Sequence, residues 1–328
     1  MTARAEPSRP VAEPLRRELE AVLEEALGRP VDVASLESEP CEFAGRWPSH
    51  VLRLELGDGT RLRLFRKEVG LSGHPDKTIP DKEVRMYRDV LAGDGLPVPA
   101  YYGARPRPGT DRHALYLEYV DDHSLKYQGL ESWYRAAEAV GGLHAAFAGR
   151  VRELEGSGVL LLLDEAYFER WVDRARTEVA AHVPELAPGV EALLSGYGAV
   201  AETLAGAPPT LVHNDLGSRN VVVDRSDPDL GVYLVDWENA SLGCGVLDLT
   251  HLVYGLDPDP RRRMCEAYFG ALADTALEPA TDDEARRLVA AAEVHRAVYR
   301  LGRCRYRGYS AGATGELLAH GLEARREL

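Results

Sequence analysis

A short polar loop, LVHNDLGSRNVVVD (Leu211–Asp224), interrupts a hydrophobic stretch of the chain. It contains His213, Asp215 and Asn220, and the hydrophobic segment that follows ends at Asp236. A carboxylate and an amide oxygen suit a hard cation such as Mg²⁺, which takes one or two carboxylates plus substrate phosphates. If paired strands bring Asn220 and Asp236 to one end of a hairpin, Asp215 is left to accept a proton from a substrate hydroxyl. The spacing therefore predicts phosphoryl transfer, although His213-Asn-Asp215 alone is equally typical of a turn that caps a helix.

The elements before this loop are rich in strand patterns, and residues 15–120 are expected to form an N-terminal lobe. His50–Leu56 and Thr60–Lys67 alternate apolar and polar residues on either side of Gly57-Asp58-Gly59, which predicts a β-hairpin. Residues 1–14, rich in Pro, Ala and charge, are expected to be a flexible tail. The other elements expected here are helices at Leu15–Leu27 and Asp81–Ala92 and a strand at Leu115–Val120.

Residues 121–328 have mostly helical periodicity and are expected to form a larger C-terminal lobe that carries the catalytic loop, the metal site and a substrate-binding region. A strand-turn-strand island is expected at Val221–Val223 and Val232–Val235. Helices are expected at Ser132–Ala148, Tyr167–Ala181, Val190–Ala205, Arg261–Ala273 and Asp282–Arg300. The fold class expected is α+β, with two lobes joined near Glu118–Ser124, and clefts between lobes are favoured ligand sites.

With these elements in place, LVHNDLGSRNVVVD followed by VYLVDWENASLGCGVLDLTHL resembles the aminoglycoside phosphotransferase and choline kinase-like family. That family has the two-lobed protein-kinase-like fold, with a small antiparallel-sheet N-lobe and a larger, mostly helical C-lobe. Its pattern is His-x-Asp-x-x-x-x-Asn, then a hydrophobic strand ending in Asp-Trp-Glu, then a Gly and a downstream Asp-Leu. A weaker resemblance runs through RLRLFRKE, DKEVRMYRDVL, LYLEYVDDHSL and GGLHAAF, so that it covers roughly Val51 to Leu252.

The resemblance implies a role for each matching residue. Asp215 would be the catalytic base, and Lys67 would neutralise the nucleotide phosphates while Glu83 holds it in place. Asn220 and Asp236 would bind Mg²⁺. The remaining residues implied are the loop supports His213 and Asp248 and the nucleotide contacts Glu118, Val120 and Val222.

Two features depart from the pattern or leave it open. The loop SEPCEFAGRWPSH before the first hairpin strand contains only Gly45 and lacks a GxGxxG, so a glycine-rich phosphate flap is absent. The cation is also ambiguous, because Arg66 and Lys67 lie on opposite faces of the expected strand. We favour Lys67, since the family has Lys directly before an acidic residue, as in Lys67-Glu68.

Composition restricts the partners. The net charge of −14 opposes binding to nucleic acid or to an anionic membrane. Four scattered cysteines without a CxxC pair indicate reduced thiols and a cytoplasmic location. The sequence contains no apolar run long enough to span a bilayer. Net acidity favours an amine-bearing hydroxyl acceptor such as an aminoglycoside or related antibiotic, although acidity is also an ordinary device for solubility.

The acceptor itself is the least determined feature. Glu238, Asp164 and Glu169 are the carboxylates expected to face an amine, although those of DEAYFERWVDRA (Asp164–Ala175) equally fit a solvated helix face. A sugar or other metabolite, or a Ser or Thr of a peptide in natural-product biosynthesis, are alternative acceptors. The arginine-rich segment HRAVYRLGRCRYRG is more typical of a helix with snorkelling or ion-paired arginines than of a nucleic-acid patch.

Two other classes of protein remain open at this point. One is a metallohydrolase whose metal ligands would be His213, Asp215, Asp236 and His251. In that class Asn220 and Lys67 would have no role. A pseudokinase scaffold would bind nucleotide without transfer, but it would have no need of the base Asp215.

Overall fold

The computed structural model describes residues 13–41, 47–71, 78–93, 95–120, 124–224 and 231–328. The chain forms two compact units, one of residues 1–123 with 222–238 and the other of residues 124–221 with 239–328. Val222–Glu238 thus belongs to the first unit, whereas the sequence placed it in the C-terminal lobe. Residues 1–12 of the expected tail and residues 121–123 of the expected junction lie outside the described residues.

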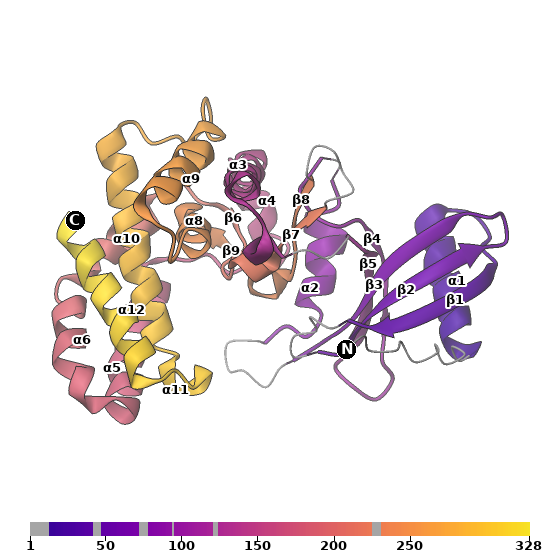
Figure 1. The fold of residues 1–328 in the computed structure, drawn as a ribbon, viewed down its shortest axis with the longest axis horizontal. Coiled ribbons are helices and arrows are strands. Elements are labelled where there is room, and N and C mark those ends of the chain that lie inside the picture. Colours follow the sequence, from indigo (N-terminus) through magenta and orange to yellow (C-terminus); the bar gives the residue numbers. More distant parts are fainter. Residues whose placement is uncertain (1–12, 42–46, 72–77, 94, 121–123, 225–230) are drawn as a thin grey trace, which may run out of the picture. The chain divides into compact units, whose positions relative to one another are not determined.

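The first unit contains a five-stranded antiparallel sheet of order β1-β2-β3-β5-β4 (Figure 1). The predicted hairpin is confirmed as β2 and β3, with Leu52 opposite Leu64. The two edge strands, β1 and β4, were not predicted. They end in Pro40 and Pro106, and Pro is tolerated at sheet edges while it weakens a strand pattern. The bounds are β1 Val33–Pro40, β2 Ser49–Leu56, β3 Arg61–Val69, β4 Tyr101–Pro106 and β5 His113–Glu118.

Helix α1 (Glu13–Leu27) covers one face of this sheet (Figure 1). It begins at Glu13, so the last two residues of the expected tail are helical. Its buried stripe of Leu19, Val22 and Leu23 packs on sheet residues that include Leu64. Because side chains alternate along a strand, this contact fixes which residues of β3 face α1 and which face away from it.

The prediction of one regular α-helix over Asp81–Ala92 is wrong. It is a short α-helix, α2 (Lys82–Arg85), that continues as a π-helical segment, η1 (Met86–Val90). Such π-helical segments are rare and frequently lie at functional sites. The unit also contains the paired strands β7 (Val221–Asp224) and β8 (Gly231–Leu234), and the turn 225–230 between them lies outside the described residues.

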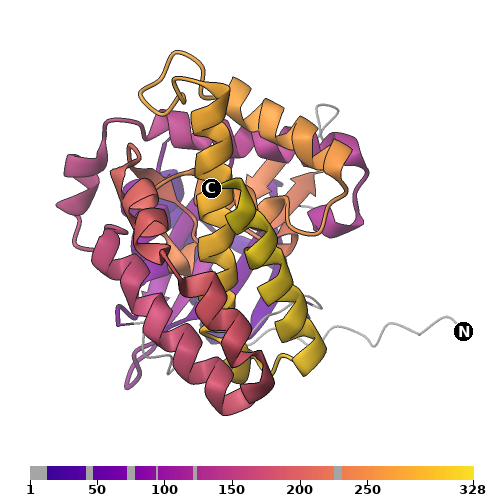
Figure 2. The ribbon, with the colours of Figure 1, turned by 90° about the vertical axis from the view of Figure 1, so that its left-hand side faces the viewer.

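The second unit is mainly helical, with α10 packed against α5, α7, α8 and α12 (Figure 2). Within the described residues, no helix has both the length and the apolar character needed to cross a membrane. The helices are α3 Leu130–Ala146, α4 Val151–Glu155, α5 Glu165–His182, α6 Ala187–Leu194, α7 Tyr197–Gly206, α8 Val246–Leu252, α9 Pro258–Gly270, α10 Asp282–Leu301, α11 Cys304–Arg307 and α12 Ala311–Ala324. Strands β6 (Thr210–Val212) and β9 (Ser241–Gly243) pair, and 3₁₀ turns lie at Leu125–Tyr127, Pro184–Leu186, Ser218–Asn220, Trp237–Asn239 and Arg325–Glu327.

The single helix predicted at Val190–Ala205 is also wrong, because the structure divides it into α6 and α7. Gly196 adopts φ 73° at the break, a left-handed conformation that glycine adopts without steric cost. Apolar residues keep a helical spacing on both sides of Gly196, so the sequence pattern alone predicts one continuous helix. The antiparallel sheet of the first unit and the helices of the second confirm the expected α+β class.

Candidate active site

The predicted site residues fall into two groups, one in each unit. In the first unit, Lys67 on β3 is held by two carboxylates. Its Nζ lies 2.8 and 3.0 Å from the Glu83 carboxylate oxygens and 2.5 Å from Asp236 Oδ1. The Glu83 side chain is only 4% exposed and that of Lys67 14% exposed, so this is a largely buried cluster.

The ambiguity between Arg66 and Lys67 is decided by the faces of β3. Arg66 donates to the Tyr116 hydroxyl and to the Glu68 carboxylate. Tyr116 belongs with Leu64 to the core against α1, whereas Lys67 extends from the opposite face toward Glu83. Lys67 is therefore the cation that meets the acidic residue of the following helix.

The charges of this cluster do not cancel, because two carboxylates share one ammonium. Burial raises the pKa of Glu83, Lys67 opposes this, and the negative charges of Asp236 and Glu238 add to it, so that the pKa lies at about 7. Burial lowers the pKa of Lys67, but Asp236 and Glu83 outweigh it and raise that pKa above its ordinary value. The excess negative charge suits an additional cation at Asp236.

Asp236 is placed by the turn that follows β8. The buried indole of Trp237 donates from Nε1 to the carbonyl oxygen of Leu234 at 3.0 Å, which closes the chain back on the strand. Asp236 takes φ 71°, in the left-handed region that non-glycine residues seldom occupy. Such strain often marks functional positions. Its side chain remains 37% exposed although it contacts Lys67.

In the second unit, the Asp248 carboxylate anchors the predicted catalytic loop. It is 1% exposed and accepts the backbone N–H groups of His213 at 2.6 Å and Asn214 at 2.8 Å. Burial acts to raise the pKa of Asp248, but the hydrogen bond and charge of His144 and the N–H of His213 hold it below its usual value. Asn214 has φ 61°, so a buried anion stabilises a strained backbone next to Asp215.

Asn220 holds the other side of the same loop. Its Nδ2 donates to the Asp215 carbonyl oxygen at 2.9 Å, and the Gly217 N–H donates to that oxygen at 2.8 Å. Since the amide nitrogen is used inside the loop, the Asn220 Oδ1 is the atom left to act as an acceptor or metal ligand. The Asp215 side chain is half-buried, on a backbone fixed from both ends.

Two further residues, His144 and Tyr268, support Asp248 from behind. The sequence alone did not assign this role to them. His144 Nε2 lies 3.3 Å from the Asp248 carboxylate, and its Nδ1 lies 2.9 Å from the Tyr268 hydroxyl. A Cβ at Gly245 would lie 2.6 Å from both His144 Nδ1 and the Tyr268 oxygen. The signal available in the sequence was Gly245 three residues before Asp248, on the first turn of α8. His144 thus forms its hydrogen bonds in the interior of the second unit.

The expected nucleotide contacts lie in the first unit. The N–H of Glu118 donates to Ala100 and the N–H of Tyr119 donates to Arg63, so both are used within the unit. Val222 is half-buried on β7. Gly45 and the other residues of 42–46, in the loop before the first hairpin strand, lie outside the described residues.

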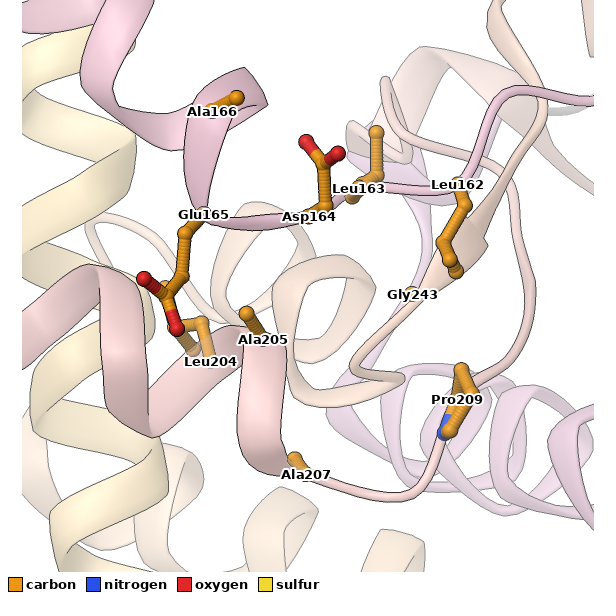
Figure 3. Close-up of a pocket in the computed structure, with 10 residues that line it drawn as sticks. All are labelled: Leu162, Leu163, Asp164, Glu165, Ala166, Leu204, Ala205, Ala207, Pro209 and Gly243. Atoms are coloured by element: carbon orange, nitrogen blue, oxygen red, sulfur yellow. The ribbon is translucent and has the colours of Figure 1, made fainter.

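Of the carboxylates expected to face an amine, Glu238 lies in the first unit, whereas Asp164 and Glu169 belong to α5 of the second. Asp164 caps α5, where its Oδ1 accepts the Tyr167 N–H at 2.8 Å, and Glu169 is exposed on the same helix. Asp164 also lines a pocket of about 310 Å³ with Glu165 and apolar residues of α7 (Figure 3). That pocket contains none of the predicted catalytic residues.

The metallohydrolase alternative receives no support. Over the described parts of the chain, no three His, Cys, Asp or Glu side chains converge in a way that could hold a metal ion. Burial and the charges of Arg300 and Arg296 lower the pKa of His251 to about 3. A metal cation beside His251 would be repelled by the same two arginines.

The chain matches the phosphotransferase enzyme family over residues 42–297. It also resembles a thermostable mutant of an aminoglycoside phosphotransferase in a ternary complex with ADP and hygromycin B, at 14% identity and TM-score 0.60 over 94% of this chain and 98% of that one. The Plasmodium vivax ethanolamine kinase is similar at 11% identity and TM-score 0.58 over 90% and 84%. A choline kinase from Streptococcus pneumoniae is similar at 14% identity and TM-score 0.56 over 94% and 99%. No curated protein matches the chain in sequence. At these identities the structures concern the fold alone, and they confirm the expected two-lobed, protein-kinase-like α+β fold.

Proposed function

Because the chain belongs to the phosphotransferase enzyme family, we propose that it transfers the γ-phosphoryl group of ATP, or of another nucleoside triphosphate, to a hydroxyl of a small molecule. The observation that carries the proposal is the Lys67 ammonium held by both Glu83 and Asp236. A lysine fixed by a helix carboxylate is what phosphoryl-transfer enzymes of the kinase type use against the nucleotide phosphates.

Asp215 acts as the base. As the acceptor oxygen forms its bond to the γ-phosphorus and the bond to the β–γ bridging oxygen breaks, the hydroxyl proton passes to the Asp215 carboxylate. The bonds from Asp248 and Asn220 to the loop backbone keep this carboxylate in place. Lys67 offsets negative charge on the nucleotide phosphates throughout.

Asp236 and Asn220 would hold Mg²⁺. The donor set fits the ion, because both residues offer oxygen and the cluster around Lys67 has an excess of negative charge. When bound, Mg²⁺ supplies positive charge to the nucleotide phosphates. Val120 would supply the N–H that reads the base, since those of Glu118 and Tyr119 are already used, and Val222 would lie under the ring.

The acceptor classes follow from the family and from the sequence. An amine-bearing antibiotic, an aminoglycoside among them, is the class that the net charge of −14 favours. Amino alcohols, which the names of similar ethanolamine and choline kinases suggest, belong in the same comparison. Sugars, other metabolites and Ser or Thr of a peptide complete the set.

The test is phosphate transfer from radiolabelled ATP to a panel of these acceptors. Asp215→Asn is expected to lower kcat by about 10²–10⁴-fold while calorimetry shows Mg-ATP binding close to wild type. Asp236→Ala is expected to weaken Mg-ATP binding. Glu202→Gln, a change at an exposed carboxylate on α7, is the control and is expected to change neither. Wild-type turnover in Asp215→Asn refutes the mechanism, whereas tight Mg-ATP binding with no transfer to any acceptor favours a pseudokinase.

A further inference from the structure

Arg296 departs from the expectation for the segment HRAVYRLGRCRYRG (residues 295–308), whose arginines are expected to snorkel or to be ion-paired. It lies on α10 and is only 1% exposed. Within the described residues it forms no ion pair, and its Nε, Nη1 and Nη2 atoms are buried without a hydrogen-bond partner. A guanidinium has five N–H donors and keeps its charge inside a protein. Arg296 is thus a buried cation with unsatisfied donors.

A tyrosine ring covers one face of this guanidinium. The Arg296 Cζ lies 3.8 Å from the centroid of the Tyr254 ring, and the His320 ring of α12 lies against the same tyrosine, with centroids 5.2 Å apart. Burial and the charge of Arg300 lower the pKa of Arg296 to about 10, while Glu293 and Tyr254 act in the opposite direction. A ring attracts a cation over its face. It does not supply the acceptors that the N–H groups at the edge of the guanidinium need.

Two further donors without a partner accompany Arg296. Arg300, one turn later on α10, has its Cζ 5.8 Å from the Tyr254 centroid, and its Nε is buried without a hydrogen-bond partner in the described chain. The Nδ1 of His251 on α8 is buried in the same way. Burial and the charges of Arg300 and Arg296 lower the pKa of His251 to about 3, so the imidazole is neutral at pH 7 and can donate one N–H. The unsatisfied donors thus come from α8 and α10, which pack against each other.

The carboxylates around this cluster are engaged elsewhere or exposed. Glu293, one turn before Arg296, is paired with Arg261 at 2.8 Å, so one carboxylate serves two guanidinium groups. Asp248 accepts two backbone N–H groups of the predicted catalytic loop. Glu323 on α12 is exposed. Water accepts N–H groups without offsetting a charge, and a buried charge is costly unless it is paired. The missing partner is therefore an anion.

We propose that the second unit binds a small monatomic anion of the chloride kind at the N–H edge of Arg296, beside Arg300 and the His251 imidazole. A single charge is favoured over a sulfate or phosphate, because the cost of removing an ion from water rises with its charge. The anion links α10 to α8, the helix on which Asp248 lies one turn before His251. The site goes beyond the proposed function, since the anion takes no part in phosphoryl transfer.

Thermal unfolding of the full chain in sodium chloride and in sodium gluconate at equal ionic strength tests the site, because gluconate is a far larger anion. The Tm of the wild type is expected to rise by about 3–6 °C when chloride reaches about ten times its dissociation constant. Arg296→Met replaces the guanidinium with an unbranched apolar side chain, so its Tm should be the same in both salts. Arg287→Met, at an exposed arginine of the same helix, is the matched control and should respond as the wild type does.

Crystals grown with bromide in place of chloride give a readout that does not depend on stability. Anomalous scattering should show a bromide peak at the N–H edge of Arg296. If Arg296→Met does not fold, Arg300→Met should still reduce the response of the Tm to chloride. Equal Tm values of the wild type in chloride and gluconate, or water alone at Arg296 in the bromide crystals, overturn the inference. So does a rise with chloride that Arg296→Met shares, which is a general salt effect, or an Arg296-dependent rise with sulfate but not with chloride.

Discussion

Replacing Asp248 by Asn tests how the catalytic loop is held. The carboxylate accepts two backbone N–H groups, from His213 and Asn214, and lies 3.3 Å from His144 Nε2. An Asn side chain has one acceptor oxygen, so its NH₂ would face a buried N–H donor. Hydrogen bonds to a charged group contribute about 1.5–3 kcal/mol each, so losing one and weakening another is expected to cost about 3–5 kcal/mol. For a unit of this size that lowers the Tm by about 6–20 °C.

Thermal unfolding and initial rates measured together check this prediction. Activity should fall by more than the unfolded fraction accounts for, because the two N–H groups hold the backbone directly before Asp215. The pKa of Asp248 is lowered in the folded protein, so its stabilisation is present above the ordinary value of 3.8 and is lost as the pH falls below it. The deficit of the variant should therefore persist at pH 7.

Asp164→Asn is the matched control. Asp164 accepts a single N–H at the exposed start of α5, and Asn caps a helix about as well as Asp. It should stay within about 0.5 kcal/mol of wild type. If Asp248→Asn unfolds at the wild-type temperature and turns over at the wild-type rate, the reasoning about the loop is refuted.

Two further predictions concern the helical unit. A Cβ at Gly141 of α3 would lie 2.6 Å from a backbone carbonyl oxygen of α9, whereas one at Gly142 meets nothing within 4 Å. Gly141→Ala should therefore lower the free energy of unfolding, measured in urea, by about 1–3 kcal/mol. Gly142→Ala should raise that free energy by about 0.5–1 kcal/mol. Equal effects of the two substitutions would contradict the packing of α3 on α9. Burial lowers the pKa of His295 to about 3, so below pH 6.5 the unfolded chain binds a proton that the folded one does not. Stability should then fall from pH 6.5 to 5 by up to about 1.4 kcal/mol per pH unit for this group, and the urea midpoints of His295→Gln should decline less; parallel declines would count against a buried neutral imidazole.

Elements with a strong local pattern could be predicted from the sequence, and elements at edges and breaks could not. The hairpin of β2 and β3 follows from alternation around a glycine turn. The strands β1 and β4 depend on pairing with neighbours, and their prolines obscure the pattern. The helix breaks at Gly196 because this one residue has a left-handed φ angle. The spacing of the apolar residues on both sides is that of a single helix, so the sequence pattern does not reveal the break.

The same division holds for the site. The order and spacing of Asp215, Asn220 and Asp236 could be recognised in the sequence because each lies close to the start or end of a hydrophobic segment. The choice between Arg66 and Lys67 was not, because it depends on which face of β3 packs against α1. Alternation along a strand defines two faces without stating which of them is covered.

The sequence by itself determined the class of chemistry, because the groups proposed to perform it lie within short segments of fixed spacing. Only the tertiary structure decided what surrounds them. Asp248 meets its two N–H donors across 34 and 35 positions of the chain, and Lys67 meets Asp236 across 169 positions. A net charge of −14 is a sum over the whole chain. Only folding determines where individual charges gather, and it places the carboxylates of Glu83 and Asp236 around the ammonium of Lys67.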